Sequence, residues 1–340
     1  DNFTSYPPVQ GYKDLREAIA NKLKKENNLD CSADQIIVSA GAKHSLANAI
    51  MSIINKGDEV IIPAPYWVSY VEQVKLAEGK NVVVKTKLDN NFKMTPEQLR
   101  EAITPKTKAI LLCSPSNPTG SIYSREELEA LAKVVAESDH KIYVISDEIY
   151  EYINFEGKHE SISQFDSIKD QVIIINGVSK GYAMTGWRIG YMAAPLEIAK
   201  ACGKLQGQVT SGACSIAQRA SLKDITTKKD FTVEMNQAFK RRRDLVLEGL
   251  KQINGMELYT PNGAFYLFPK VDYFFGKSNG NWKINNDQDL CFYLLEEANV
   301  ALVPGRAFGS EEYIRLSYAA SDEELKEALT RIKIALDKLK

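Results

Sequence analysis

Short apolar runs that alternate with helix-like stretches constrain the fold of this chain more than any other feature of its sequence. Each run ends close to Gly, Pro, Ser or Asp, and together they occupy residues 35–41, 58–66, 81–87, 108–115, 141–148 and 171–177. Between them, Leu15, Ile19 and Leu23 recur at helical spacing, and Ser124 begins a Ser-x-x-Glu capping box. Apolar strands that alternate with helices predict an α/β fold whose large domain has a mostly parallel sheet flanked by helices.

The pattern changes near residue 230, and the segment 231–250 has the character of one long helix. Beyond it we expect shorter strand-like and helical segments at 258–271, 287–298, 300–305, 313–319 and 322–339. The polar stretch 276–287 is predicted to be a surface loop. We therefore expect a large domain over residues 1–235 and a smaller α+β domain over residues 236–340.

The composition argues against several classes of protein. The 340 residues carry a formal net charge of −1, so no basic field would attract nucleic acid or an anionic membrane. No apolar run approaches the ~20 residues that a membrane-spanning helix needs. The five cysteines form no CxxC pair, which favours a reducing cytoplasm, and Cys113 is expected to be a buried spectator. His44, His140 and His159 lack metal-ligand spacing, so we expect no metal site.

Polar residues follow several of the predicted strands, at the edge where parallel sheets hold their ligands. Lys180 follows the run 171–177 among small and apolar neighbours, where partial desolvation would lower its pKa and make its amine nucleophilic. Arg188 could grip a phosphate, and Asp147 and Tyr150 follow another strand. Taken singly, an ordinary surface lysine is by far the commoner interpretation of Lys180, and an ordinary ion pair is the alternative for Arg188. For Asp147, a Lys or Arg partner is as open as a ligand.

Weaker signals lie at other junctions. Gly41, Ala42 and Lys43 join a strand to a helix start, where backbone N–H groups could hold an anion, although a plain turn fits as well. Trp67 could stack on an aromatic ligand or pack in the core, and Asn117 lies among turn-forming residues.

Period-two alternation over residues 313–319 places Arg315 on the opposite face from Ile314 and Leu316. Its guanidinium could clamp a carboxylate, and a position on the rim is the alternative. The chain has neither a G-x-G-x-x-G fingerprint nor a P-loop, which disfavours a nicotinamide dehydrogenase or an ATP site.

Four segments, read together, resemble the landmarks of one family. SPSNPTG, SDEIY, GVSKGYAMTGWRIG and YIRLSYA, at residues 114–120, 146–150, 177–190 and 313–319, are similar in kind and order to the motifs of fold-type-I, class I aminotransferases that use pyridoxal 5'-phosphate (PLP). The resemblance covers essentially the whole chain. It is nearest to the bacterial aspartate, or aspartate/prephenate, aminotransferase subgroup, through PYWVSY, SDEIYE and AMTGWRIGY.

The resemblance implies a role for each matched position. Lys180 would hold PLP as a Schiff base and, once displaced by the substrate, would act as general base. Asp147 would keep the ring nitrogen protonated, and Arg315 would bind the substrate α-carboxylate. The remaining cofactor contacts would be Trp67 on the ring, Asn117 and Tyr150 on its phenolic oxygen, and Arg188, Ser179, Gly41, Ala42, Lys43 and the neighbouring subunit's Tyr6 at the phosphate. A homodimer is therefore expected. Trp67, Asn117 and Lys43 would also contact substrate.

The implied reaction moves an α-amino group between an amino acid and a 2-oxo acid with ping-pong kinetics. Lys43 matches a position that serves the distal carboxylate of acidic substrates in the subgroup. This favours aspartate and glutamate with 2-oxoglutarate and oxaloacetate, and prephenate as an additional acceptor, while a phosphate role for Lys43 stays open. The alternatives are a carbon–sulfur lyase, an aromatic-amino-acid aminotransferase, and a non-catalytic PLP-fold module, which should have lost Lys180 or Asp147.

The chain departs from the resemblance in two places. Gly177 stands where some relatives carry a phosphate-binding serine, so Ser179 is expected to serve instead. The chain opens without an initiator Met, and we expect it to be the interior of a longer protein whose N-terminal segment completes the small domain and closes over the substrate.

Overall fold

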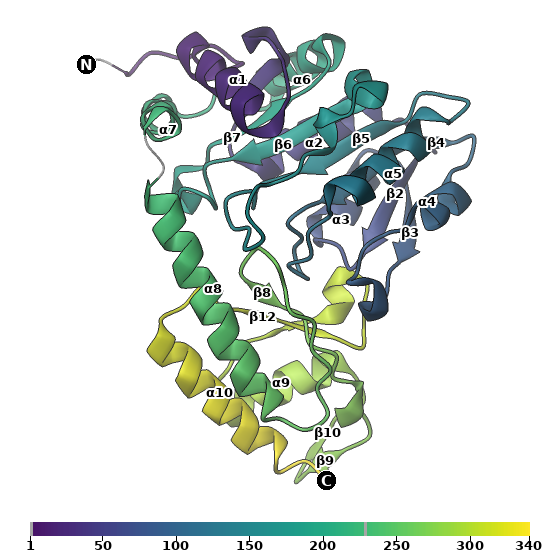
Figure 1. Cartoon of the computed structure of the whole chain (residues 1–340), viewed down its shortest axis with the longest axis vertical. Helices are drawn as coiled ribbons and strands as arrows, with labels where there is room; N and C mark the ends of the chain where they lie inside the picture. Colours follow the sequence, from purple (N-terminus) through teal and green to yellow (C-terminus); the bar gives the residue numbers. More distant parts are fainter. Residues whose placement is uncertain (1–2, 228–229) are drawn as a thin grey trace.

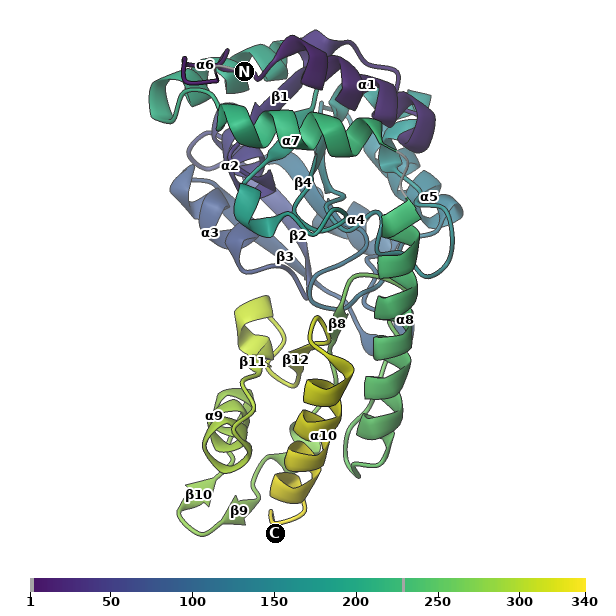
Figure 2. The ribbon, with the colours of Figure 1, turned by 90° about the vertical axis from the view of Figure 1, so that its left-hand side faces the viewer.

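The computed structural model of the chain describes residues 3–227 and 230–340, which form two regions (Figure 1). The larger region contains a seven-stranded sheet, and the smaller region contains a three-stranded sheet. Helix α8 (Asp230–Lys251) begins beside the larger region and runs along the smaller one (Figures 1 and 2). The expected boundary between residues 235 and 236 falls inside this helix and stays a prediction.

The seven-stranded sheet has the strand order β1-β7-β6-β5-β4-β2-β3. The bounds are β1 Ile36–Ser39, β2 Glu59–Ala64, β3 Lys80–Lys85, β4 Thr107–Cys113, β5 Tyr143–Asp147, β6 Val172–Gly177 and β7 Gly190–Ala193. β7 is antiparallel to both of its neighbours, and the other pairs are parallel. The prediction of a mostly parallel sheet is confirmed, and each of the six apolar runs overlaps one strand. The sequence patterns do not predict β7.

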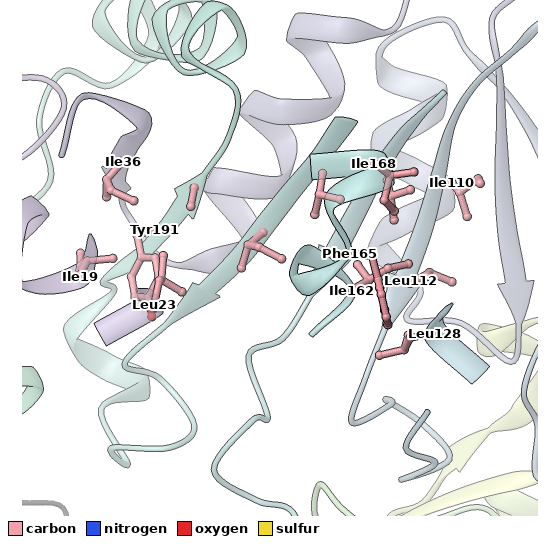
Figure 3. Packing of buried hydrophobic residues seen from close by; sticks show 14 of the residues in the cluster. Ile19, Leu23, Ile36, Ile110, Leu112, Leu128, Ile162, Phe165, Ile168 and Tyr191 are labelled. Atoms are coloured by element: carbon pink, nitrogen blue, oxygen red, sulfur yellow. The ribbon is translucent and has the colours of Figure 1, made fainter. Parts of the chain in front are cut away.

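Helices cover both faces of this sheet. They are α1 Lys13–Asn27, α2 Ala42–Ile53, α3 Ser69–Leu76, α4 Pro96–Ala102, α5 Arg125–Ala136, α6 Leu196–Val209 and α7 Ser215–Thr226. Successive strand residues point to opposite faces, because Val144 packs in the cluster that contains Leu128 of α5, whereas Ile145 packs in the cluster that contains Ile50 of α2. Figure 3 shows part of the first cluster, with Leu128 among its labelled residues. Burial on both faces explains the continuous apolar runs.

Two predicted helices begin and pack as expected. Leu15, Ile19 and Leu23 all lie on the buried face of α1. α5 follows Ser124, whose hydroxyl accepts a hydrogen bond from the backbone N–H of Glu127, while the Glu127 carboxylate accepts one from the N–H of Ser124. The predicted capping box is therefore confirmed.

The smaller region is built from α8, α9 (Asp287–Ala298), α10 (Asp322–Leu336) and a sheet of β11 (Val303–Pro304), β12 (Ile314–Ser317) and β8 (Tyr266–Leu267). The prediction that residues 276–287 form a surface loop is wrong in part. Residues Ser278–Asn279 (β9) and Trp282–Lys283 (β10) pair as a short hairpin, because the Trp282 ring packs edge-on against Tyr293 of α9 at 5.7 Å.

The two regions contact each other through backbone hydrogen bonds near the carboxyl ends of the strands. Gly120 O, after β4, accepts from the N–H groups of Asn262 and Gly263, and Phe308 O accepts from the N–H of Tyr66. Within the described residues, no helix has the length and apolar character that crossing a bilayer requires.

Candidate active site

A cavity of about 280 Å³ lies where these regions meet, at the carboxyl ends of the parallel strands. Most of the residues selected from the sequence line it: Ala42, Lys43, Trp67, Asn117, Asp147, Tyr150, Ser179, Lys180, Arg188 and Arg315. Cys113 also lines the cavity and is half-buried, so the expectation of full burial is wrong, whereas its role as a spectator stays a prediction. Burial raises the pKa of the Cys113 thiol to about 12, which keeps the thiol neutral.

Lys180 lies just beyond β6, with its ammonium nitrogen 5.7 Å from the ring centroid of Tyr150 and 5.3 Å from that of Phe265. Burial lowers the pKa of Lys180, and the positive charges of Arg188 and Arg315 lower it further. A lowered pKa increases the fraction of neutral amine, which is the nucleophilic form. The site therefore provides the activated amine that the sequence predicts.

Asp147 is the last residue of β5 and is almost fully buried. One carboxylate oxygen accepts a hydrogen bond from the Tyr70 hydroxyl at 2.8 Å, and the other accepts from the N–H of Ile149 at 3.2 Å. Burial raises the pKa of Asp147 to about 6, although these two hydrogen bonds oppose the shift. No described Lys or Arg forms a salt bridge with Asp147, so the carboxylate can pair with a cationic group of a ligand.

Arg188 and the start of α2 form an anion-binding corner. The guanidinium of Arg188 lies so close to Gly41 that a side chain at residue 41 would place its Cβ 2.3 Å from Nη2. On the other side, a Cβ at Gly190 would lie 2.1 Å from the backbone nitrogen of Ala42. These two glycines therefore bring a guanidinium and the N-terminus of a helix together, which is the donor set that a phosphate prefers.

Gly177 and Ser179 differ in their access to this corner. A Cβ at Gly177 would lie 2.7 Å from Gly190 Cα and 2.8 Å from Ile189 O, so the backbone leaves no room for a serine there without a shift. Ser179 lines the cavity. This arrangement is consistent with the expectation that Ser179 supplies the hydroxyl in place of residue 177.

Arg315 enters the cavity from β12 of the smaller region. Its Nη1 donates to Asn117 Oδ1 at 2.9 Å, and its guanidinium carbon lies 4.5 Å from the ring centroid of Tyr266. Its Nε is buried and has no hydrogen-bond partner. A buried, unpaired N–H is costly, so this edge of the guanidinium suits a carboxylate ligand. Tyr266 also shares a hydrogen bond with the Tyr150 hydroxyl at 2.8 Å.

Lys43 and Trp67 are neighbours in the part of the lining that the larger region supplies. The Lys43 ammonium lies 4.8 Å from the Trp67 ring centroid, and Trp67 packs edge-on against Tyr70 at 5.4 Å. Both roles expected for Lys43, at the phosphate or at a distal carboxylate, therefore remain open. Tyr6 lies outside this cavity, and its side chain is 94% exposed.

A second group of ionisable side chains is buried behind β5, outside the cavity. Glu148, Glu151 and His159 lie within 4.8 Å of one another, and the Lys22 ammonium is paired with Glu151. Burial opposes ionisation of Glu151, but the charges of Lys22 and His159 outweigh it and lower the pKa of Glu151. The Glu148 carboxylate accepts from Ser146, Ser161, Asn27 and His159. The charges within this group compensate one another, and none of its residues lines the cavity that contains Lys180.

Sequence analysis assigned no role to Tyr70 or Tyr266, although Tyr70 is the last residue of the segment PYWVSY. Tyr70 lies on α3 and Tyr266 on β8, so each reaches its partner, Asp147 or Tyr150, only through the fold. The one available signal was the position of Tyr70 three residues after Trp67, which places both near the start of the same helix.

The chain matches the family model described as aminotransferase class I and II over residues 1–332. This chain belongs to that family. It is 47% identical over 342 residues to a probable aspartate/prephenate aminotransferase of Rickettsia bellii, covering 100% of this chain and 86% of that protein. It resembles the crystal structure of the Rhizobium meliloti aspartate aminotransferase with a TM-score of 0.96 and 44% identity, covering 100% of this chain and 85% of that one.

An aromatic aminotransferase from Pyrococcus horikoshii OT3 is a more distant structural relative of this aminotransferase, with a TM-score of 0.92, 37% identity, and coverage of 98% of this chain and 88% of that one. Enzymes of this family depend on PLP. The residues present fit that cofactor: the corner at Gly41 and Arg188 suits its phosphate, the Asp147 carboxylate, which forms no salt bridge with a described Lys or Arg, suits its ring nitrogen, and the Lys180 amine suits its aldehyde.

Proposed function

We propose that this aminotransferase moves the α-amino group between aspartate or glutamate and the 2-oxo acids oxaloacetate and 2-oxoglutarate, with prephenate as a further acceptor. The observation that carries the proposal is that two cations besides Lys180, Arg315 of the smaller region and Lys43 of the larger region, line one cavity. Two cations match the two carboxylates of an acidic amino acid. The relatives named as aspartate and aspartate/prephenate aminotransferases support the same choice.

In this proposal PLP, when bound, supplies an electron sink, which takes up the electron pair of the substrate Cα–H bond when the proton leaves. Asp147 would keep a proton on the ring nitrogen, because a buried carboxylate is stabilised by an adjacent cation. Tyr150 and Asn117 would hydrogen-bond the phenolic oxygen, and Trp67 would contact the ring. Arg188, Ser179, Gly41 and Ala42 would hold the phosphate.

The Lys180 amine carries the proton transfer. When it is not bound to the cofactor, Nζ would be placed to accept the substrate Cα proton and to give a proton back, as general base and then general acid. Burial and the charges of Arg188 and Arg315 lower the pKa of Lys180, which favours the neutral amine that this step needs. Arg315 fixes the α-carboxylate, so that the Cα hydrogen points to one face.

We further propose that the enzyme works as a homodimer in the cytoplasm, with Tyr6 of each subunit reaching the phosphate of the other. The 94% exposed ring of Tyr6 is available for such a contact. Cross-linking through a cysteine introduced at residue 6, with and without dilution below the dimer dissociation constant, tests this part. A protein that remains monomeric and fully active would contradict it.

A panel of amino donors against 2-oxoglutarate, oxaloacetate and prephenate tests the substrate assignment. Aspartate and glutamate should be the best donors. The second candidate is an aromatic-amino-acid aminotransferase, which the rings of Trp67, Tyr266 and Tyr150 in the cavity wall favour. Preference for phenylalanine or tyrosine over aspartate would support that candidate, and release of pyruvate and ammonia from cystathionine without an acceptor would support a carbon–sulfur lyase.

A further inference from the structure

A cluster of aromatic rings joins the two regions beside the cavity. Phe92 belongs to the larger region and lies on the connection between β3 and α4, whereas Phe268, Phe308 and Tyr313 belong to the smaller region. The Phe92 ring lies 5.9 Å from Phe268 and 5.3 Å from Tyr313, and Phe268 lies 5.8 Å from Phe308. These edge-to-face contacts form a continuous path of rings from the larger region to Phe308.

Phe308 is the ring of this cluster that contacts Arg315. The guanidinium carbon of Arg315 lies 4.8 Å from the Phe308 ring centroid, and Phe308 is only 2% exposed. The backbone oxygen of Phe308 also accepts from the N–H of Tyr66 at 3.1 Å. Phe308 is therefore fixed by both regions. A guanidinium that rests on such a ring loses orientations it would otherwise sample.

The backbone at Phe92 supports the same interpretation. Asn91 and Phe92 have φ values of 53° and 56°, in the left-handed region that a bulky residue rarely adopts. The larger region holds this turn, because the Ser121 hydroxyl donates to Asn91 O at 2.6 Å and the Tyr123 hydroxyl accepts from Met94 N at 2.8 Å. A left-handed conformation of this kind costs free energy, so it persists only where surrounding contacts hold it in place. Here those contacts direct the Phe92 ring into the cluster.

We propose that Phe308 is a positioning residue for Arg315, and that Phe92 extends this support to the larger region. The cluster then sets the affinity of the cavity for the substrate α-carboxylate. This inference rests on the proposed function, because it takes Arg315 as the ligand of that carboxylate. Phe308 and Phe92 act through Arg315, so their loss should weaken the binding of carboxylates while the proton transfer at Lys180 continues.

Phe308→Leu in the holoenzyme tests the first half of this proposal, because leucine keeps an apolar side chain and removes the ring face. We expect the KM for aspartate, and the Kd of the unreactive dicarboxylate maleate measured by isothermal titration calorimetry, to rise about threefold to tenfold. The kcat should change by less than about twofold. Phe92→Leu should act in the same direction by about twofold to threefold, although Phe92 does not contact Arg315.

Phe274→Leu is the matched control, because Phe274 is equally buried in the core of the smaller region, where it packs against Tyr273. It should lower the melting temperature like Phe308→Leu and leave the Kd of maleate unchanged. A wild-type Kd in Phe308→Leu, or an equal rise in Phe274→Leu, would overturn the proposal. An unaltered Kd in Phe92→Leu would overturn the part that concerns the larger region.

Failure of the wild-type enzyme to use aspartate would contradict the proposed function alone. The ratio of maleate Kd values between variant and wild type does not depend on turnover, so it tests the inference separately.

Discussion

The larger region brings to the cavity residues from the ends of several strands and helices, whereas the smaller region brings Arg315 and Tyr266 from two adjacent strands. The groups of the larger region include Lys180 and Asp147, whose pKa values are shifted by burial. Arg315, in contrast, is held by rings and by one hydrogen bond across the boundary. The difference suggests a division of labour, in which the larger region controls the chemistry and the smaller region controls carboxylate binding.

Lys180→Ala tests the chemical side of this division and should have the largest effect. Without this amine the site loses the group that is proposed both to bind the aldehyde covalently and to carry the Cα proton, so kcat should fall by at least about 10³-fold. Borohydride reduction followed by peptide mass spectrometry should attach the cofactor to residue 180 in the wild type and to no residue in the variant. Unchanged turnover in Lys180→Ala would contradict the mechanism.

Asp147→Asn should abolish the activity of the enzyme and yet stabilise the cofactor-free protein against unfolding. Because the fold raises the pKa of Asp147 from 3.8 to about 6, its contribution to stability is fully present below pH 3.8 and is lost as pH rises through 6. The cofactor-free variant should therefore be more stable than the cofactor-free wild type at pH 7.5, by up to about 3 kcal/mol.

Urea unfolding of the cofactor-free proteins at several pH values measures this difference. The advantage of Asp147→Asn should shrink between pH 6 and pH 4, while its transaminase activity is lost at every pH. If the two proteins respond to pH in parallel, the carboxyl of Asp147 is not destabilised by burial.

Lys43→Ala tests whether carboxylate binding belongs to the smaller region alone, because Lys43 lies in the larger region and yet is proposed to bind substrate. Loss of a charge-assisted contact should raise the KM for aspartate roughly tenfold or more and leave the KM for alanine within about twofold. Arg315→Ala is the reference, since it should weaken both donors alike. Equal effects of Lys43→Ala on both donors, together with weaker cofactor binding, would assign Lys43 to the phosphate.

Tyr70→Phe should give the smallest effect, because it removes one hydrogen bond from Asp147 and keeps the ring. The kcat should fall about threefold to tenfold with little change in KM. Since this hydrogen bond lowers the pKa of Asp147, its removal should move the acid limb of the kcat–pH profile to higher pH. A changed KM together with an unchanged acid limb of the kcat–pH profile would indicate that Tyr70 acts on substrate binding instead.

The sequence predicts local features of the fold well and relations between distant elements poorly. The six apolar runs and the capping box at Ser124 are visible because burial and capping leave regular local patterns. The strand β7 is only four residues long and begins at Gly190, the last residue of the lysine motif, so it has no pattern of its own. The hairpin at residues 278–283 has even shorter strands and is mostly polar, so it also lacks a recognisable pattern. It depends on the contact between Trp282 and Tyr293.

The candidate site follows the same rule. Lys180, Asp147, Arg188 and Arg315 stand in recognisable motifs, and the fold brings them to one cavity. Tyr70 and Tyr266 received no role from the sequence, because their importance comes from partners 77 and 116 positions away in the sequence. The contact between Phe92 and Phe268 belongs to the same class, since it exists only when the turn at Asn91 and Phe92 meets the smaller region.

The two glycines at residues 41 and 190 have a consequence for how variants of this enzyme can arise. Each leaves space for a group on a different segment, Arg188 for one and the Ala42 backbone for the other. At Gly190 a mutation cannot be compensated by changing a neighbour, because the nearest atoms belong to the backbone of residues 41 and 42. At Gly41 the nearest atoms are the movable end of Arg188, and the φ of 90° is what strains any other residue. A homologue with other residues at both positions is therefore expected to have a different backbone here and a weaker phosphate site.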